Sequence, residues 1–473
     1  MGIFDFWISK VKTSLGYQQS FIDCVEAGNI ADALGMMCND STEQQNAYKE
    51  YKTDSHPIMQ RADKAIYDND GKFKGWVKRW KLPLSYPQYI NEIALVFIYG
   101  RPPLWVQRSL DTDNAYKAFC DFLEDKHFDS RIREAKRLAG AELKSAMLFH
   151  TFQNKEGKAD CLIKVLAKSL GDDLYYMKDQ FDRLVYFARG YWLRNRGNES
   201  VYHVDIYTDD WIYYCVKNSI GWDVDKQRNY AGKKPILLLE QEKEWDGATN
   251  LMERQEYLKS RTADVNDYIA DPALVATADV IKGMPEKDAE NKLYVLSEKG
   301  KLEYLTPDSA SELKKNEMDD NEKHIFRETF TPNIDFEVMR TLSNVSGKAL
   351  EQMMLLGNIK ADKRKEKHDE YMRRAANIVK AIIGNVTNIE LHAEVERLVV
   401  RHEFQKPFGE DITEAITNAI KEVNAGGMSK ETLVELNPLI KDKAREKERL
   451  QQEQQTKEQR EDKLAGQNLF GYQ

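Results

Sequence analysis

Two long stretches of the chain contain neither proline nor glycine, and they constrain its fold more than any other feature. Residues 248–270 form the first and residues 308–331 the second, and both are predicted to be helices. Pro272 ends the first stretch, because the residue before a proline is pushed out of the helical region. Pro307 opens the second helix and Pro332 closes it. The chain is therefore predicted to carry two helices with sharply defined ends.

Both predicted helices have little apolar surface. In the first, Leu251, Leu258 and Val265 fall seven residues apart and form a narrow stripe suited to a neighbouring helix. The second has 7 acidic and 4 basic residues, and a helix that is polar almost all round either bridges solvent or lines a wet cavity. Its thin apolar face consists of Leu313, Met318, Ile325, Phe326 and Phe330. Part of the burial of these helices is therefore expected to come from neighbouring subunits.

The segments on either side of the second helix are predicted to be irregular or small. Residues 271–307 read as a separate β module, with a hairpin at Glu298-Lys299-Gly300. Residues 332–347 cannot continue the preceding helix, yet they carry several apolar side chains, so they are predicted to form an ordered loop with a function. The longest helix is predicted over residues 348–383, with a kink at Gly357, because glycine costs about 1 kcal/mol there relative to alanine.

The rest of the chain predicts an α+β fold. Residues 87–99 form an apolar helix, and the aromatic and β-branched residues of 201–214 and 233–241 favour strands. Two short strands are predicted at 388–391 and 396–404. A helix at 411–424 follows, broken by Gly426-Gly427, and Ser429 is placed to cap the next one. Residues 441–463 are expected to be a solvated helix or a frayed tail.

Composition excludes several classes of protein. The net charge of -8 shows no global basic excess of the kind that tight nucleic-acid binding needs. Five cysteines without a repeated spacing indicate neither a disulfide framework nor a zinc site. The longest fully apolar run, residues 93–99, is too short to span a bilayer. Residues 4–11 could form a membrane-surface helix, but packing against the body is favoured, so we expect no membrane partner.

Motifs for catalysis are absent, and we expect neither an enzyme nor a cofactor or metal. Gly347-Lys348 is followed by Ala349 where a P-loop needs Ser or Thr. One enzymatic alternative stays open: Asp205, Asp209 and Asp210 could hold magnesium for nucleic-acid cleavage, with His203 on the same strand face as Asp205. Turns and strand edges use aspartates far more often. The basic block at residues 360–374 is likewise expected to be an exposed helix face laced with ion pairs.

Four segments together resemble the portal proteins of tailed bacteriophages, in the sub-group typical of siphophages of Gram-positive hosts. The strand at 234–241 leads into a helix as it does in that family, and residues 428–450 resemble the family's crown. Residues 86–105 resemble its wing helix, which ends in Gly-x-Pro, here Gly100 and Pro102. The likeness in the long helix is carried by Asn344, Ser346, Gly347, Ala349, Leu350, Leu356 and Gly357. Residues 1–81 show no pattern of the family.

The resemblance implies a portal fold with an α/β wing, a two-helix stem, a small β-rich clip, a long kinked helix and an α-helical crown. The implied division is wing 1–244, stem helix 245–270, clip 271–307, stem helix 308–331, tunnel loop 332–347, wing 348–407, and crown and tail 408–473. The tunnel loop would meet DNA through Asn333, Ile334, Phe336, Val338, Met339, Arg340, Leu342 and Asn344. The stem would supply passing phosphate contacts from Lys314, Lys315, Lys323 and Arg327, which could equally pair with acids of the adjacent stem helix.

The same resemblance implies the partners and the place of the protein. It predicts a ring of twelve subunits through which double-stranded DNA passes. Terminase large subunit would dock at the clip, major capsid and scaffold proteins around the wing, and a head–tail adaptor below. The protein would assemble in the host cytoplasm and reside at the portal vertex of the virion. The alternatives are a homomeric structural or adaptor protein without DNA passage and, with less support, the metal-dependent enzyme.

Overall fold

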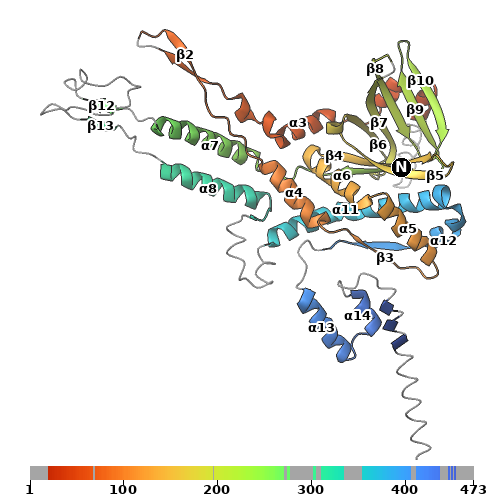
Figure 1. Cartoon of the computed structure of the whole chain (residues 1–473). Helices are drawn as coiled ribbons and strands as arrows, with labels where there is room; N and C mark the ends of the chain where they lie inside the picture. The colour runs from red at the N-terminus through yellow and green to blue at the C-terminus, as the bar shows by residue number, and fades with distance from the viewer. Residues whose placement is uncertain are drawn as a thin grey trace, which may run out of the picture. The chain divides into compact units, whose positions relative to one another are not determined.

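The computed structural model separates into two units, which we describe one at a time. One unit comprises Met1–Asp335 with Met354–Gln405, and the other comprises Phe336–Met353 with Lys406–Gln473. The residues that the structure describes are 20–67, 70–194, 197–270, 274–276, 302–304, 311–334, 354–405, 412–436, 446–447, 449–450 and 452–453. Figure 1 shows how the elements follow one another along the chain.

The body of the larger unit is a small sheet between helices. Its three antiparallel strands lie in the order β11-β4-β5, and both α6 and α11 contact β11. Burial from both sides explains the continuous apolar run Ile-Leu-Leu-Leu in β11. The elements are α4 (Tyr86–Tyr99), α5 (Asp113–Asp125), α6 (Phe128–Glu142), α11 (Leu355–Ile382), β4 (Lys144–Gln153), β5 (Ala159–Leu166) and β11 (Ile236–Glu240).

A second sheet packs beside the first. Its strands follow one another in sequence as an antiparallel meander: β6 (Asp172–Lys178), β7 (Leu184–Arg194), β8 (Ser200–Tyr207), β9 (Trp211–Lys217) and β10 (Trp222–Arg228). One face carries Ala188, which packs with the helix at residues 20–26 and with α2 (Ile30–Gly35). The opposite face carries Phe187, which packs with residues of the three-stranded sheet. The predicted α+β class and the strands expected at 201–214 and 233–241 are confirmed.

Two antiparallel helices leave this body, as the sequence predicted (Figure 1). They are α7 (Thr249–Ala270) and α8 (Ser311–Glu328). Between them, β12 (Leu274–Ala276) pairs with β13 (Leu302–Tyr304). The turn expected at 298–300 lies outside the described residues. Strand pairing across the two ends of this segment nevertheless agrees with a β module between the helices.

Residues 20–67 and 70–81, which belong to the segment where the sequence showed no family pattern, also contain regular elements. After α3 (Ser41–Tyr51), short 3-10 turns cover Thr53–Ser55 and Pro57–Gln60. The strands β1 (Lys64–Tyr67) and β2 (Phe73–Val77) then form an antiparallel hairpin.

The long helix differs from the prediction at both ends. It begins at Leu355 in the described residues, whereas residues 348–353 lie outside them. Gly357 lies in its first turn, where an added Cβ would stand 2.4 Å from Cζ of Phe97. Glycine therefore lets α11 approach α4 closely, and the kink expected there depends on residues that are not described. The helix ends in a π-helical turn at Ile383–Thr387.

The strand predicted at 388–391 is wrong. This segment forms a 3-10 turn, Ile389–Leu391, followed by α12 (His392–Arg397). A short apolar run does not distinguish strand from helix, and here the i,i+4 pair His392–Glu396, 3.6 Å apart, accompanies the helix. The second predicted strand is real but shorter: β14 (Val400–Glu403) pairs with β3 (Leu104–Gln107).

The smaller unit contains the helices expected near the end of the chain. They are α13 (Ile412–Asn424) and α14 (Lys430–Leu436). Gly426 has φ +79°, which favours glycine at the break between them. The amide of Thr432 donates to Oγ of Ser429 at 3.1 Å, so Ser429 caps α14 as predicted.

Candidate functional site

The helix pair α7/α8 is held together by a narrow strip of contacts. Met252, Leu258 and Ile325 are buried along it. The Gln255 amide donates to the Met318 carbonyl at 3.0 Å. Arg254 and Glu317 form an ion pair at 2.8 Å, with about half of the Arg254 side chain exposed. The apolar stripe expected from the sequence is therefore confirmed in part: Leu258 and Ile325 are buried in the strip, whereas Leu313 and Phe330 are exposed.

The four basic residues predicted to contact DNA all lie on α8. Lys315, Lys323 and Arg327 are exposed, and Lys314 is half-buried. Within the part of the chain that the structure describes, none of the four forms an ion pair, and Arg254 makes the interhelical pair instead. The alternative was that these four residues only form ion pairs with the adjacent helix. The described residues give that alternative no support.

The chain just before α7 is fixed by a buried charge cluster. The Glu244 carboxylate is fully buried and lies 2.6 Å from Nζ of Lys136 and 3.2 Å from Nζ of Lys360. Nε of Arg364 lies 3.5 Å away. Lys136 belongs to α6, and the other two cations belong to α11. One carboxylate thus ties two helices of the body to the base of α7.

The electrostatics of this cluster favour its charged form. Burial alone would raise the pKa of Glu244, but the three cations outweigh it and hold the pKa well below its usual range. Burial lowers the pKa of Lys360 to about 8 despite the nearby carboxylate. Close by, burial lowers the pKa of His368 to about 3. The neutral His368 ring is hydrogen-bonded to the Tyr99 hydroxyl at 2.8 Å.

This cluster corrects the prediction for residues 360–374. The block was expected to be an exposed helix face, and Lys363, Lys367 and Arg373 are indeed exposed. Lys360 and Arg364, however, point inward to Glu244. Arg374 donates from Nε to the Ile236 carbonyl at 3.1 Å. The signal that could have shown this is the small residue Ala361, because it lies three residues before Arg364 and so places Arg364 on the packed face of α11.

An extended segment ahead of α4 runs along α7 and was not predicted. The amides of Leu84, Leu82 and Trp80 donate to α7 side chains: to Oε1 of Glu256 at 2.7 Å, to Oγ of Ser260 at 2.9 Å and to Oδ1 of Asp264 at 2.8 Å. Two extended residues span about 6.6 Å, close to the rise of about 6 Å over four helix residues. Every second amide of the segment therefore meets every fourth residue of α7.

A buried ion pair strengthens the same face of α7. Nδ1 of His56 lies 2.6 Å from Oε1 of Glu256, and both side chains are buried. The other ring nitrogen of His56 is bonded to the Glu50 carbonyl at 2.8 Å. Burial disfavours the charged imidazole, yet the Glu256 carboxylate outweighs it, so the pKa of His56 is raised.

The predicted tunnel loop begins at a groove beside α8. The Ile334 amide donates to the Tyr89 hydroxyl at 3.1 Å. Asn333 and Ile334 line a groove of about 350 Å³ together with Tyr86, Tyr89 and Phe326. The other predicted loop residues, Phe336, Val338, Met339, Arg340, Leu342 and Asn344, lie outside the described residues.

Three of the four residues of the enzymatic alternative have structural partners, and the fourth, Asp210, is exposed. Asp205 is buried and lies 4.0 Å from Nη1 of Arg189, and burial raises its pKa to about 6. Asp209 pairs with Lys234 at 2.5 Å, and the His203 ring stacks on Tyr191. In the described ranges, no group of three or more His, Cys, Asp and Glu side chains could hold a metal ion. The geometry gives this alternative no support.

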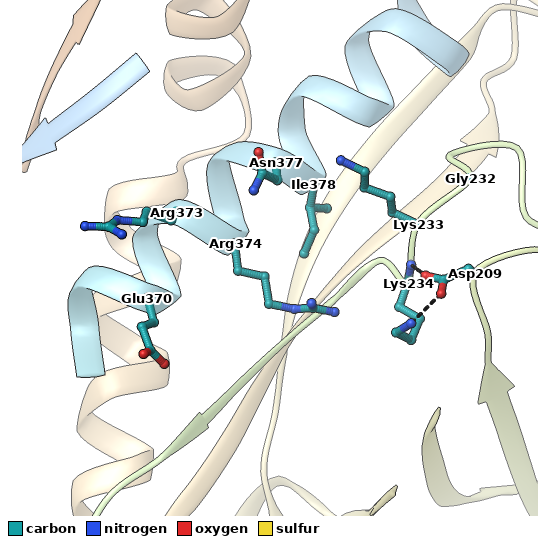
Figure 2. A pocket seen from close by; sticks show the side chains of 9 residues that line it. All are labelled: Asp209, Gly232, Lys233, Lys234, Glu370, Arg373, Arg374, Asn377 and Ile378. Carbon is teal, nitrogen blue, oxygen red and sulfur yellow. Dashed lines mark hydrogen bonds and ion pairs between the residues drawn. The ribbon is translucent and has the colours of Figure 1, made fainter. Parts of the chain in front are cut away.

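A basic cavity lies between α11 and the turn before β11 (Figure 2). It measures about 640 Å³ and is lined by Asp209, Gly232, Lys233, Lys234, Glu370, Arg373, Arg374, Asn377 and Ile378. Figure 2 shows Asp209 paired with Lys234. Sequence reasoning missed this cavity because its residues come from three segments of the chain, at residue 209, at 232–234 and at 370–378. No helix in the described residues is both long and apolar enough to cross a membrane.

Comparison with known proteins identifies the family. A model of the family described as "Phage portal protein, SPP1 Gp6-like" matches residues 39–460. Comparison with curated proteins finds no match. The chain is similar to a chain in "Neck of native GTA particle computed with C12 symmetry", at 8% identity over 75% of this chain and 90% of that one, with a TM-score of 0.40.

Two further solved structures show a likeness of the same order. One is "Virion of native gene transfer agent (GTA) particle", at 6% identity, covering 83% of this chain and 92% of that one, with a TM-score of 0.40. The other is "Neck of empty GTA particle computed with C6 symmetry", at 7% identity, covering 73% and 85%, with a TM-score of 0.37. The family match spans most of the sequence and confirms the resemblance drawn from it: the chain belongs to the phage portal protein family.

Proposed function

We propose that twelve copies of this chain close into a ring around a channel for viral DNA at one vertex of the capsid. The observation that carries the proposal is the exposed surface of α7 and α8. Their contact strip is narrow, and Leu313 of α8 is 73% exposed. Neighbouring copies in a ring would cover such a surface, and a closed ring satisfies every copy equally.

The charge of the helix pair suits a conduit. Residues 308–331 carry 7 acidic and 4 basic side chains, and residues 245–270 carry 5 acidic and 3 basic. Each phosphate that Lys or Arg neutralises strengthens DNA binding through released counterions. A mildly acidic wall therefore lets DNA slide, while the exposed Lys315, Lys323 and Arg327 supply transient contacts.

The remaining assignments follow from the family. We propose that α7 and α8 form the stem, that residues 271–307 form the clip where terminase docks, and that the two sheets belong to a wing that faces capsid and scaffold proteins. A head–tail adaptor would bind below the ring. Residues 332–347 would form the tunnel loop, with their apolar side chains packed on neighbouring subunits.

The tunnel loop gives a direct test of DNA passage. In a phage whose own copy of this gene is deleted, the chain is supplied as wild type or as the double variant Phe336→Ala/Met339→Ala. We expect rings of normal appearance and a drop of at least tenfold in packaged genomes. The matched control is Ile220→Ala, which truncates an apolar side chain that is 98% exposed between β9 and β10. A normal genome yield from the double variant would contradict the proposed role of the loop.

A further inference from the structure

The hairpin β1–β2 carries large aromatic side chains that are exposed among the residues that the structure describes. We call residues 64–81 the arm. Tyr67 is 61% exposed, Phe73 49% and Trp76 65%. An isolated two-stranded hairpin is marginally stable in water, and an exposed apolar cluster marks an interaction surface. The arm therefore requires a partner.

Both ends of the arm are fixed on one turn of α7. Nη2 of Arg61, just before the arm, lies 2.7 Å from the Asp264 carboxylate. At the other end, the Trp80 amide donates to Asp264 at 2.8 Å, and the Trp80 indole donates to Asp267 at 2.5 Å. The residues between these anchors project from α7, where Figure 1 shows the hairpin labelled β2.

The charge of the arm differs from that of the molecule. The arm has 6 basic and 2 acidic residues, although the whole chain has a net charge of -8. Lys64, Lys74 and Lys78 are exposed on it. A surface that combines aromatic and basic side chains suits a partner that is acidic and partly apolar.

The first part of α8 offers that complement. Residues 312–322 carry 5 acidic and 2 basic side chains. Glu312, Asp319 and Asp320 are exposed there, and so is Leu313. Leu313 and Asp320 lie seven residues apart, so they share one face of the helix.

The arm leaves its own α7 from a face that α8 does not occupy. The arm and the segment after it bind α7 at Glu256, Ser260 and Asp264. The helix α8 contacts α7 at Arg254 and Gln255. In the described residues, Tyr67, Phe73 and Trp76 of the arm and Glu312, Leu313 and Asp319 of α8 are thus exposed in one chain, and a second copy can join them. Within the chain, Glu317 and Asp320 form ion pairs with Arg254 and His324.

We propose that the arm docks on residues 312–322 of α8 in a second copy of this chain, the neighbour in the ring. This inference rests on the proposed ring and names one of its contacts. Because each copy both gives an arm and receives one, the contact runs head to tail and closes around the ring.

A charge exchange tests the docking. In the triple variant Lys64→Glu/Lys74→Glu/Lys78→Glu, we expect at least a tenfold loss of assembled rings by native mass spectrometry. Adding Glu312→Lys/Asp319→Lys/Asp320→Lys to the same chain should restore assembly. The matched control, Lys155→Glu/Lys158→Glu/Lys217→Glu, reverses three exposed lysines elsewhere and should assemble normally. Normal assembly of the triple lysine variant would overturn the docking. So would a loss of rings that the three substitutions on α8 do not restore.

Cross-linking gives an answer that does not depend on stability. A bifunctional maleimide added to rings of Trp76→Cys/Leu313→Cys should produce a ladder of covalent oligomers on a denaturing gel. Wild type, with its five native cysteines, and each single variant should not. Rings without the ladder would overturn the docking and leave the proposed ring standing, whereas wild type without rings would overturn the ring itself. Lysine variants of the arm could also form normal rings and the cross-linked ladder but retain less DNA. That result would assign the basic residues to DNA and overturn their pairing with α8 of the neighbour.

Discussion

The base and the outer half of the helix pair are built in opposite ways. At the base, Trp245, Ile90 and Ile325 form a buried apolar cluster beside the fully buried Glu244. Beyond this cluster, in the part of the helix pair that we call the outer half, Leu313 is exposed, and the interhelical ion pair Arg254–Glu317 faces solvent. The base is thus complete within one chain, whereas the outer half exposes surface that neighbouring copies would cover in the proposed ring. Buried contacts fix the helices where they leave the body.

The largest effect is expected at the base. Glu244→Ala would leave Lys136 and two further cations buried without their carboxylate, which should lower the free energy of unfolding by about 5 kcal/mol. Denaturant unfolding followed by tryptophan fluorescence measures this. The matched control is Glu242→Ala, because that carboxylate also pairs with Arg364 but is 67% exposed, and its removal should cost below about 1 kcal/mol. Equal effects of the two variants would break the contrast between the two regions.

A smaller loss is expected where the extended segment binds α7. His56→Ala would leave the buried Glu256 without its ionic partner and should cost about 3 kcal/mol. The pKa of His56 is raised above 6.5 in the fold, so the folded state holds this proton more tightly than the unfolded state. The stabilisation of the fold by the His56–Glu256 ion pair is fully present below pH 6.5. It is lost as the pH rises through the higher pKa of His56 in the folded state. The free energy of unfolding, measured at pH 6 and pH 8.5, should decline with pH more in wild type than in His56→Ala. The same pH dependence in both proteins would exclude the charged pair.

The smallest effect is expected in the outer half. Arg254→Ala removes a half-exposed ion pair and should lower the free energy of unfolding of the isolated chain by about 0.5 kcal/mol. High salt should erase the difference, because salt screens exposed charges. A loss above about 2 kcal/mol, or one that salt leaves unchanged, would show that the outer half is as firmly built as the base.

Much of the architecture could be predicted from the sequence because its signals are local. Prolines delimit α7 and α8, the pattern of apolar residues marks α4 and β11, and Ser429 caps α14. The strand predicted at 388–391 was wrong because four residues cannot separate a strand from a helical turn without their tertiary surroundings. Local signals therefore suffice for long elements and fail for short ones.

The candidate site was harder to predict from the sequence, because its defining contacts join residues that are far apart in the chain. Glu244 meets Lys136 and Lys360, which are more than a hundred residues away on either side. The hydrogen bonds from Trp80 to α7 likewise join residues 184 and 187 positions apart. Charge counts identified α8 as polar, but only the fold shows which of its charges stay unpaired among the described residues. Inward-facing lysines in a basic block resemble exposed ones until the packing is known.

The mass and symmetry of the purified protein test the central claim most directly. Twelve copies of 54.9 kDa amount to about 659 kDa. The account predicts a species of that size by native mass spectrometry, with an open centre and rotational symmetry in negative-stain images. A stable closed oligomer without a central hole would contradict the channel and favour a structural or adaptor protein that passes no DNA.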